Sequence, residues 1–351
     1  MDESAYIAAL LQDLERDCAM VAGRELISIF IGGGTPSLFS GQAINSLLDG
    51  IRSKLACAQN MEVTLEANPG AVDQEHFTAY RYAGVNRLSI GVQSFAPEAL
   101  SKLGRIHGPD EAMAAVDVAR QAGFENLNLD FMFGLPGQTR DAAQQDLIRA
   151  ISLQPEHLSY YQLTIEPNTL FYTKPPTLPE DERLWEIEAA GHKLLQASGY
   201  RQYEVSAFAQ AGSECRHNLN YWEFGDYLGI GAGAHGKITD AVAGLVRRYQ
   251  KPRAPERYIE HANTGFTSPG TQSLSQPDLV LEFMLNVLRL THGFPRELFQ
   301  RRTGLSLRHI QSQLDQAEDQ GLLKVDEASV WPTEMGRRFL NELLAIFLPQ
   351  E

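Results

Sequence analysis

Short apolar runs alternate with amphipathic segments over the first half of the chain. Five runs are rich in β-branched and aromatic residues, and between them apolar residues recur every three or four positions. The runs span residues 26–31, 61–66, 87–93, 126–133 and 158–165. Runs of this length between amphipathic helices are typical of parallel strands covered by helices. The order of elements therefore predicts an α/β barrel or an open parallel sheet.

Two of the intervening helices can be placed from their boundary residues. The first begins near Pro109, buries Ala112 and Val116 on one face, and stops at Gly123. The second, in residues 141–155, repeats the pattern and ends at a proline.

The chain opens in a helix with no strand before it. Ile7, Leu11, Leu14 and Cys18 share one helical stripe, and this helix leads into the run at 26–31. In a repeat of strand followed by helix, such a start resembles a unit whose front half is missing.

The pattern changes after about residue 205. SECRHNLNYWEFGDYLGIGAGAHG is rich in glycine and aromatic residues and is not periodic, and residues 252–277 are predicted to be a loop. Residues 279–293 then predict a helix with Leu281, Leu285 and Leu288 on one side.

Further helices are predicted at the C-terminal end of the chain, in residues 296–304, 307–321 and 334–348. Between the last two, LLKVDEASVWPT predicts a small β-hairpin, as in a winged-helix-like module. We therefore divide the chain into a barrel at 1–205, a connecting region at 206–270 and a mainly helical domain at 271–351.

Composition and charge narrow the classes of partner. The formal net charge is −14, which repels phosphate backbones, so we expect no nucleic-acid partner. The densest basic stretch is predicted to be a solvated loop; it contains Arg247, Arg248, Lys251, Arg253 and Arg257. No stretch approaches the roughly 18 apolar residues that span a bilayer, and MDESAYIAALLQDLERD lacks the pattern of a signal peptide. We expect a cytoplasmic protein.

Three cysteines are scattered along the chain, at Cys18, Cys57 and Cys215. They make neither a disulfide framework nor a metal-ligand cluster of the CxxC kind. Each is predicted to be an ordinary buried or half-buried thiol.

Polar residues follow or end the predicted strands. The set comprises Gly32, Gly33, Gly34, Thr35, Glu66, Asn68, Gln93, Ser94, Asp130, Gln162 and Thr164. Ligands of parallel α/β barrels bind at the carboxyl ends of the strands. A buried carboxylate such as Glu66 or Asp130 needs a partner or a ligand. A salt bridge within the barrel would satisfy one such residue, but agreement over four strands favours a binding site.

The glycine loop IGGGTPS fails two familiar tests. A P-loop needs GxxxxGK[ST], and this loop has no lysine; a dinucleotide fingerprint needs GxGxxG, and Ser37 occupies its last glycine position. Bare backbone facing a small zwitterion or a ribose fits the loop better than phosphate binding does.

Six ordered blocks resemble those of a radical S-adenosylmethionine (SAM) protein. They are GGGTPS (32–37), LEANP (65–69), GVQSF (91–95), LGRIH (103–107), LDFMFGLPGQT (129–139) and YYQLTIEPNT (160–169). The set is most similar to the oxygen-independent coproporphyrinogen oxidase family. RHNLNYW (216–222) and DYLGIGAGAHG (226–236) narrow the resemblance to the heme chaperone branch of that family.

The resemblance implies a SAM site and a heme site. The backbone of Gly33, Gly34 and Thr35 would hold the amino acid end of SAM. The rest of the cofactor would be contacted by Glu66, Gln93, Arg105 and Asp130. Arg105 would face the SAM carboxylate, since its planar fork suits bidentate pairing.

For heme, the resemblance implies His217 as the contact to the iron, with Asn218, Tyr221 and Trp222 beside it. Imidazole is a normal axial ligand of heme iron, and flat aromatic side chains suit the face of the macrocycle. Without the surrounding motif, His217 reads as an ordinary loop histidine.

The sequence departs from the family in one respect. Radical SAM proteins carry CxxxCxxC just after the first barrel strand, where its thiolates bind a [4Fe–4S] cluster, and this chain has no such motif. A gene model that starts at a late methionine, a fragment and a true loss of the motif all remain open, and the intact SAM blocks favour a truncated start. We expect this chain to hold no cluster and to perform no radical chemistry.

The sequence thus predicts a partial (β/α)6 barrel of the radical SAM type, lacking its first strand, and a small, mainly helical C-terminal domain. The resemblance implies a chaperone that binds heme and passes it to an acceptor protein, which can be membrane-associated. It also implies SAM and a [4Fe–4S] cluster in the full-length form. The alternatives are an oxygen-independent coproporphyrinogen III dehydrogenase of porphyrin biosynthesis and a remnant that only binds. HNxxYW favours the chaperone.

Overall fold

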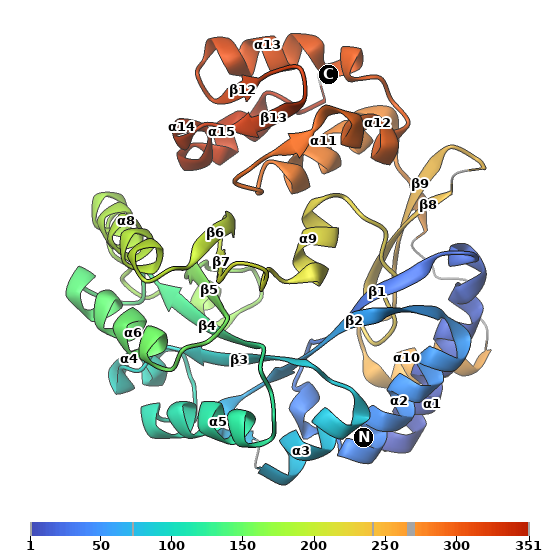
Figure 1. Cartoon of the computed structure of the whole chain (residues 1–351), viewed down its shortest axis with the longest axis vertical. Helices are drawn as coiled ribbons and strands as arrows, with labels where there is room; N and C mark the ends of the chain where they lie inside the picture. Colours follow the sequence, from blue (N-terminus) through green and yellow to red (C-terminus); the bar gives the residue numbers. More distant parts are fainter. Residues whose placement is uncertain (1, 72–73, 241, 265–270, 350–351) are drawn as a thin grey trace. The chain divides into compact units, whose positions relative to one another are not determined.

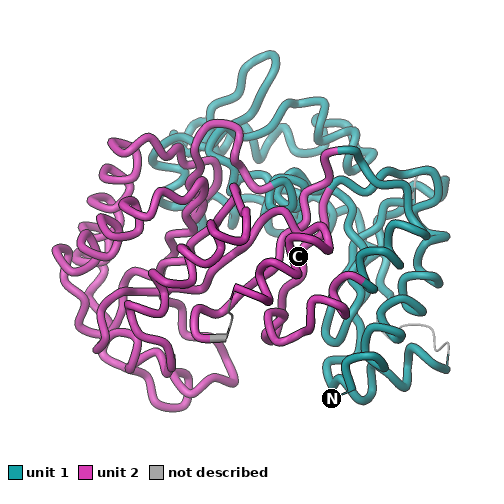
Figure 2. Tube along the Cα trace, turned by 60° about the horizontal axis from the view of Figure 1, so that its bottom comes forward, with its two compact units in different colours: residues 1–27, 46–59, 216–351 teal, residues 28–45, 60–215 magenta. Residues whose placement is uncertain are grey.

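The structure is a computed structural model that describes residues 2–71, 74–240, 242–264 and 271–349 (Figure 1). The chain forms two compact units, each assembled from separate segments (Figure 2). Unit 1 contains residues 1–27, 46–59 and 216–351, and unit 2 contains residues 28–45 and 60–215. Three of the four boundaries between the units fall within β1 (Glu25–Ile31), α2 (Gly41–Lys54) and β2 (Ala56–Ala67), and the fourth lies between Cys215 and Arg216.

Unit 2 is built on a seven-stranded sheet with the order β1-β2-β3-β4-β5-β7-β6. The remaining strands are β3 (Arg87–Gln93), β4 (Leu127–Phe133), β5 (His157–Gln162), β6 (Arg201–Glu204) and β7 (Ala207–Ala209). Strands β2 to β5 pair in parallel, whereas β7 pairs antiparallel with both β5 and β6. The parallel part confirms the predicted alternation of strands and helices.

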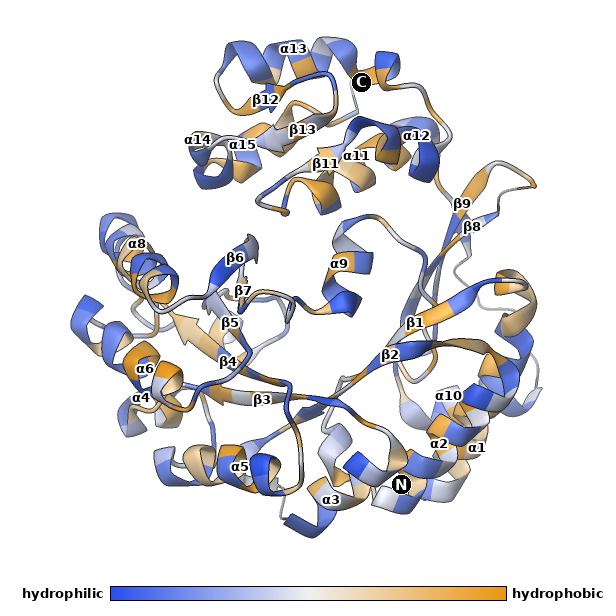
Figure 3. Cartoon of the chain, viewed as in Figure 1, coloured by the Kyte–Doolittle hydropathy of each residue, from blue (hydrophilic) through white to orange (hydrophobic). Residues whose placement is uncertain are grey.

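Helices of unit 2 cover one face of this sheet (Figure 1). They are α3 (Gln74–Ala83), α4 (Pro97–Lys102), α5 (Pro109–Gln121), α6 (Arg140–Ser152) and α8 (Asp181–Ala197). Unit 2 also contains the short helix α7 (Leu170–Thr173), none of whose residues is buried, and the 3-10 turns η2 (Pro36–Leu38) and η3 (Pro69–Ala71). Helix α5 packs on β3, and α6 and α8 pack on β4. Figure 3 shows apolar and polar residues on each of these helices, as expected of helices that cover a sheet.

The two faces of the parallel strands differ in polarity. On β3, the fully buried Leu88 and Ile90 alternate with Arg87 and Ser89. Alternate residues of a strand point to opposite faces, so the polar residues share the face away from Leu88. The register places Ser89 beside Asn128 of β4. One face of the sheet therefore carries a continuous polar surface across several strands.

Unit 1 contains the N-terminal helix and the C-terminal third of the chain. Its helices are α1 (Glu3–Asp17), α9 (Arg216–Trp222), α10 (Pro255–Thr264), α11 (Gln276–Val287), α12 (Arg296–Thr303), α13 (Gln311–Asp319), α14 (Glu334–Arg338) and α15 (Leu340–Ala345), with η1 (Cys18–Val21) and η4 (Leu307–Ile310). Its two three-stranded antiparallel sheets contain β8 (His235–Asp240), β9 (Leu245–Gln250) and β10 (Gln272–Ser273), and β11 (Phe294–Pro295), β12 (Leu323–Val325) and β13 (Ser329–Pro332).

The core of the C-terminal part is centred on Phe283 of α11. Its ring makes edge contacts with Phe224, Phe294 and Phe299, with centroids 5.7, 5.1 and 5.1 Å away. Such aromatic pairs contribute about 0.5–1.5 kcal/mol each beyond the area they bury. The predicted hairpin is confirmed, because β12 and β13 pair antiparallel.

Several predictions of local structure were wrong. The segment 252–277 is not a continuous loop, since it contains α10, β10 and the start of α11; residues 265–270 of that prediction lie outside the described residues. Strand β5 ends at Gln162, so Thr164 lies beyond it. Leu285 is 42% exposed, and the buried face of α11 is formed by Phe283 and its neighbours instead.

The basic stretch is not a solvated loop. Arg247 and Arg248 lie in β9, where Arg248 forms an ion pair with Glu282. Lys251 is 4% exposed, and its ammonium binds Asp13 and Asp17 of α1 at 2.7 and 2.8 Å. The composition of the basic stretch could not reveal that Lys251 pairs with these carboxylates, because Asp13 and Asp17 lie at the opposite end of the chain.

Candidate functional site

The glycine loop that follows β1 is shaped by Glu66 at the end of β2. Gly33 and Gly34 have φ of 80° and 64°, in the left-handed region that favours glycine. The Gly33 N–H donates to Glu66 Oε2 at 3.1 Å. A Cβ on Gly32 would lie only 2.9 Å from the carboxyl carbon of Glu66. The positive φ of Gly33 and Gly34 and the carboxyl group close to Gly32 explain why glycine occupies these three positions. The exposed backbone of the loop lies against the carboxylate of Glu66.

A buried tyrosine holds the segment that directly follows the glycine loop. Tyr80 of α3 is fully buried, and its hydroxyl donates to the Phe39 carbonyl oxygen at 2.5 Å. Pro36 and Ser37, which follow Thr35 of the glycine loop, are also buried. This support fixes the chain directly after Thr35, which is half-buried.

Gln93 ends β3 in a conformation that is rare for a residue with a side chain. Its φ is 68°, it is 5% exposed, and the Ser94 N–H bonds back to the Val92 carbonyl oxygen at 2.9 Å. Strained backbone of this kind is concentrated at functional sites. The Gln93 amide oxygen accepts a hydrogen bond from the Tyr161 hydroxyl at 2.8 Å.

Asp130 of β4 lies in a polar network on the same sheet. Its carboxylate accepts from Asn128 Nδ2 at 2.8 Å and from Ser89 Oγ at 3.2 Å. Burial raises the pKa of Asp130, and these hydrogen bonds only partly offset that effect. The network continues from the Asn128 side-chain oxygen to His157 Nδ1, at 2.6 Å. Burial and the charge of Arg87 hold the pKa of His157 well below its usual range, so this histidine is neutral.

Tyr161 connects the predicted SAM residues, and sequence reasoning did not single it out. Burial raises the pKa of its phenol, and the charges of Asp130, Arg105 and Glu66 all act on it. Burial also raises the pKa of Glu66, with a further contribution from Asp130. Tyr161 of β5 thus hydrogen-bonds one predicted residue, Gln93, and feels the charges of three others, Glu66, Arg105 and Asp130.

Two other residues near the strand ends serve different purposes. Ser94 is buried and donates to Asp146 of α6 at 2.6 Å, so it fastens β3 to a helix. Arg105 is exposed, in the turn after α4. This leaves its guanidinium accessible to a ligand carboxylate.

The chemistry of this set fits SAM. The exposed backbone of Gly33 and Gly34 suits the amino acid end, and the two carboxylates supply acceptors for amino and hydroxyl groups. Both carboxylates are partly desolvated, which strengthens their attraction to a cationic ligand such as a sulfonium.

The residues implied for heme lie on α9 and not in a loop. His217 and Tyr221 are four residues apart, and so are Asn218 and Trp222. Residues at this spacing are neighbours on a helix surface. All four side chains are half-buried. The helix thus presents an imidazole and two aromatic rings over adjacent stripes.

The aromatic rings of α9 are held by their surroundings in unit 1. Tyr221 contacts Trp222 edge-on with centroids 4.9 Å apart, and Tyr227 lies 5.2 Å from Tyr221. The guanidinium of Arg289 lies over the Trp222 ring, 4.3 Å from its centroid. The indole Nε1 of Trp222 is buried and has no hydrogen-bond partner in the described part of the chain.

Asp226 anchors the glycine-rich segment that follows α9. It accepts from Arg24 and Lys237 at 2.5 and 2.9 Å, and from the Thr239 N–H and hydroxyl at 3.0 and 2.8 Å. Burial alone would raise the pKa of Asp226, but Lys237 and Thr239 lower it overall. At residue 229 a side chain is excluded, because a Cβ on Gly229 would lie 1.9 Å from the His235 carbonyl oxygen.

The three cysteines do not provide a cluster site. Cys18 and Cys57 are half-buried, and Cys215 is buried and donates to Glu62 Oε1 at 3.3 Å, as predicted for ordinary thiols. Burial raises the pKa of Cys18 and of Cys57, which disfavours the thiolate. In the residues that the structure describes, no three His, Cys, Asp or Glu are grouped to hold a metal. The residues present do not fit a [4Fe–4S] cluster.

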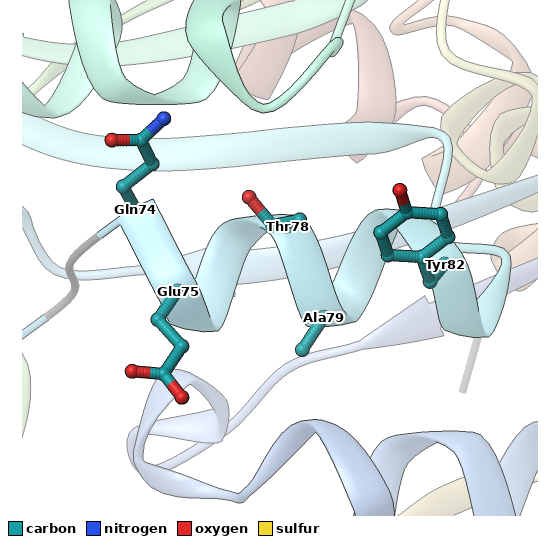
Figure 4. A pocket seen from close by; sticks show the side chains of 5 residues that line it. All are labelled: Gln74, Glu75, Thr78, Ala79 and Tyr82. Carbon is teal, nitrogen blue, oxygen red and sulfur yellow. The ribbon is translucent and has the colours of Figure 1, made fainter.

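An open pocket of ≈ 530 Å³ lies elsewhere, on α3 (Figure 4). Its lining consists of residues of this one helix: Gln74, Glu75, Thr78, Ala79 and Tyr82. Tyr82 is 87% exposed, and none of the predicted site residues takes part. We assign no function to this shallow surface.

Among the described helices, none is both long and apolar enough to span a membrane.

Comparison with known proteins places these features in a family. Residues 8–148 match the Radical SAM superfamily, and residues 274–339 match the HemN C-terminal domain. The solved structure of coproporphyrinogen III oxidase (HemN) from Escherichia coli, described as a radical SAM enzyme, is similar with a TM-score of 0.80 and 23% identity, over 98% of this chain and 83% of that one. This likeness confirms the predicted fold, a radical SAM half-barrel with a helical C-terminal region.

Two curated relatives are similar over nearly their full length. "Heme chaperone HemW" of Escherichia coli (strain K12) is 51% identical over 346 residues, which cover 98% of this chain and 90% of the relative. "Heme chaperone HemW" of Bacillus subtilis (strain 168) is 37% identical over 350 residues, which cover 98% and 91%. The chain therefore belongs to the HemW heme chaperone family of radical SAM proteins.

Proposed function

We propose that this chain is a heme chaperone, which binds heme and passes it to an acceptor protein. The observation that carries the proposal is α9, where His217 and Tyr221 form one stripe and Asn218 and Trp222 the next. An imidazole can ligate heme iron, and the adjacent rings offer flat apolar contact to the macrocycle. Family membership supports the same function, since the relatives are heme chaperones by name.

The surroundings of α9 suit transfer more than permanent storage. All four side chains are half-buried and none is fully buried, so a ligand bound there stays accessible to a partner. Three free thiols without a disulfide framework agree with the reducing conditions of the cytoplasm, where we place the protein.

We also propose that unit 2 binds SAM through Gly33, Gly34, Thr35, Glu66, Gln93, Arg105 and Asp130, with Tyr161 as an additional contact. When bound together with a reduced cluster, SAM supplies a radical in this superfamily. In this chain the residues would serve to bind and orient SAM: Glu66 holds the glycine loop, and Asp130 offers a charged acceptor beside Tyr161.

The test of heme binding is a titration followed by the Soret absorption band. Replacing His217 by alanine should weaken heme affinity by about tenfold or more, because an axial iron ligand is lost. The matched control is His309→Ala, which removes an exposed histidine of the same unit and should leave the affinity unchanged. Equal affinities of wild type and His217→Ala would exclude His217 as the iron ligand.

A further inference from the structure

A histidine behind the proposed SAM site is too deeply buried to touch a ligand. His157 of β5 is fully buried in unit 2, and its Nδ1 lies 2.6 Å from the side-chain oxygen of Asn128. Its Nε2 lies 2.9 Å from the hydroxyl of Tyr203 in β6. Asp130, by contrast, is half-buried and accessible to a ligand. His157 can therefore act on a ligand only through the residues between it and Asp130.

The charge of Asp130 decides which way the amide of Asn128 faces. The side-chain nitrogen of Asn128 lies 2.8 Å from Asp130 Oδ1 and 2.8 Å from Ser89 Oγ. The reversed amide would place an oxygen at the same distance from an ionised carboxylate, where two acceptors repel each other. The oxygen of Asn128 is thereby directed at His157 Nδ1 and at the hydroxyl of Ser159, which lies 3.1 Å away. Both donors and both acceptor positions of this amide are occupied.

The proton of His157 must then lie on Nδ1. An amide oxygen only accepts hydrogen bonds, so Nδ1 has to donate to Asn128. Burial and the charge of Arg87 hold the pKa of His157 well below its usual range, so the ring carries a single proton. Nε2 is left as an acceptor, and the Tyr203 hydroxyl donates to it. The donors thus point in one direction, from the Tyr203 hydroxyl at one end to Asp130 at the other.

We propose that His157 is a positioning residue for SAM, which holds the Asn128 amide in the orientation that supports an ionised Asp130. This inference rests on the proposed SAM site. Donors that are fixed before the ligand arrives do not have to be reordered when it binds, which favours binding. Asn128 and Ser89 each donate to one oxygen of the carboxylate, and the remaining lone pairs are left for hydroxyl or amino groups of SAM.

The first test is a calorimetric titration with SAM. His157→Leu removes the ring nitrogens and should weaken SAM binding by about fivefold, the size of one net hydrogen bond. His157→Asn keeps an N–H donor near the place of Nδ1 and should retain most of the affinity.

His192→Leu is the matched control. His192 of α8 lies against the ring of Tyr160, whose side chain points to the opposite face of β5 from that of His157. The same substitution there should leave SAM affinity unchanged.

A double-mutant cycle separates positioning from a general loosening of the sheet. In the background of Asp130→Ala, His157→Leu should have no further effect on SAM affinity, because the group through which His157 acts is already gone. Losses that add up would show that His157 acts only by packing, and they would overturn the proposal. Urea denaturation identifies any variant that does not fold.

Nuclear magnetic resonance of wild-type protein with nitrogen-15 histidine tests the position of the proton without any variant. The signal of His157 should show the proton on Nδ1 and should not change between about pH 6 and pH 8, since the ring stays neutral. Its absence from the spectrum of His157→Asn assigns the signal. A proton on Nε2 would overturn the proposal even if His157→Leu did not fold.

The remaining outcomes are distinct. If folded His157→Leu binds SAM as tightly as wild type does, the positioning role is overturned while the SAM site stands. The same holds if His157→Asn or His192→Leu weakens SAM binding as much as His157→Leu does. If wild-type protein does not bind SAM, the proposed site fails and this inference fails with it.

Discussion

At Asp130, keeping an ionised carboxylate in the predicted SAM site lowers the stability of the folded protein. Burial raises the pKa of this carboxyl, although Asn128 and Ser89 both donate to it. A raised pKa in the folded state means that the folded chain holds the proton more tightly than the unfolded chain does. Its contribution to stability is therefore complete below about pH 4 and is lost as the pH rises through the raised value. At neutral pH the ionised group is a cost to folding.

Replacing Asp130 by asparagine should therefore stabilise the protein at neutral pH and weaken SAM binding. The gain in the free energy of unfolding should be on the order of 1 kcal/mol at pH 8 and should vanish below about pH 4, where wild-type Asp130 is protonated in both states. SAM affinity should fall by about tenfold, because a charged acceptor is lost. Urea denaturation at the two pH values and calorimetric titration with SAM measure both effects.

Asp141→Asn is the matched control for this prediction. Asp141 is an exposed residue in the first turn of α6, so the same change of charge there should alter neither stability nor SAM affinity appreciably. A loss of stability at pH 8 in Asp130→Asn would show that the hydrogen bonds outweigh the desolvation of the carboxylate. Unaltered SAM affinity would remove Asp130 from the site.

At the scale of elements, a buried ionic group fastens α1 to β9 and α10. Lys251, just after β9, binds Asp13 and Asp17, and the Tyr258 hydroxyl of α10 donates to Asp13 at 2.9 Å. The Lys251 ammonium also lies 5.0 Å from the Tyr249 ring centroid. The N-terminal helix and two elements more than 220 residues later in the sequence thus meet at one ammonium group.

Replacing Lys251 by methionine should destabilise the protein by about 3 kcal/mol or more. The change leaves the buried Asp13 and the half-buried Asp17 of α1 without their cation, which is far more costly than losing an exposed pair. Urea denaturation at pH 7 gives the difference in unfolding free energy.

Lys324→Met on β12 is the comparison, since Lys324 is exposed and its loss should change stability by less than about 0.5 kcal/mol. Similar small effects for the two variants would mean that water or rearranged side chains compensate the charge of Asp13 and Asp17.

The elements that could be predicted from the sequence are those whose signal is local. The apolar run of β3 and the boundary residues of α5 lie within the elements themselves, and both predictions were confirmed. Helix α9 carries no apolar stripe. It ends at Trp222, and in the turn that follows Phe224 has a φ of 56° and the Gly225 N–H bonds to the Asn220 carbonyl oxygen at 2.6 Å. A glycine usually takes the left-handed position itself, and here it follows one residue later.

The predicted SAM residues could be chosen because they stand at the ends of strands, where parallel sheets gather their ligands. Tyr161 could not be chosen in this way, since its importance depends on the register that places β5 within reach of Gln93. The partners of Lys251 were equally hidden, because no local pattern connects a lysine to carboxylates of the first helix.

At the scale of the whole molecule, we predict that this chain does not assemble a [4Fe–4S] cluster. After anaerobic reconstitution with iron and sulfide and removal of the excess, chemical analysis should find far less than four irons and four sulfides per chain. The physical reason is the scattering of Cys18, Cys57 and Cys215, which offer no set of three thiolates. A variant with all three cysteines changed to serine should give the same background. Stoichiometric iron and sulfide that disappear in that variant would refute the prediction.

Unit 1 is closed by contacts between residues far apart in the order of synthesis. Asp13 meets Lys251, 238 positions later, and Ala232 donates to the Tyr6 hydroxyl at 2.9 Å. A ribosome that adds about 5–20 residues per second needs roughly 10–50 s to produce the second half of this pair. During that interval the buried carboxylate of Asp13 has neither Lys251 nor Tyr258 as a partner. The native contacts of α1 are thus completed only after the chain has been made as far as Tyr258.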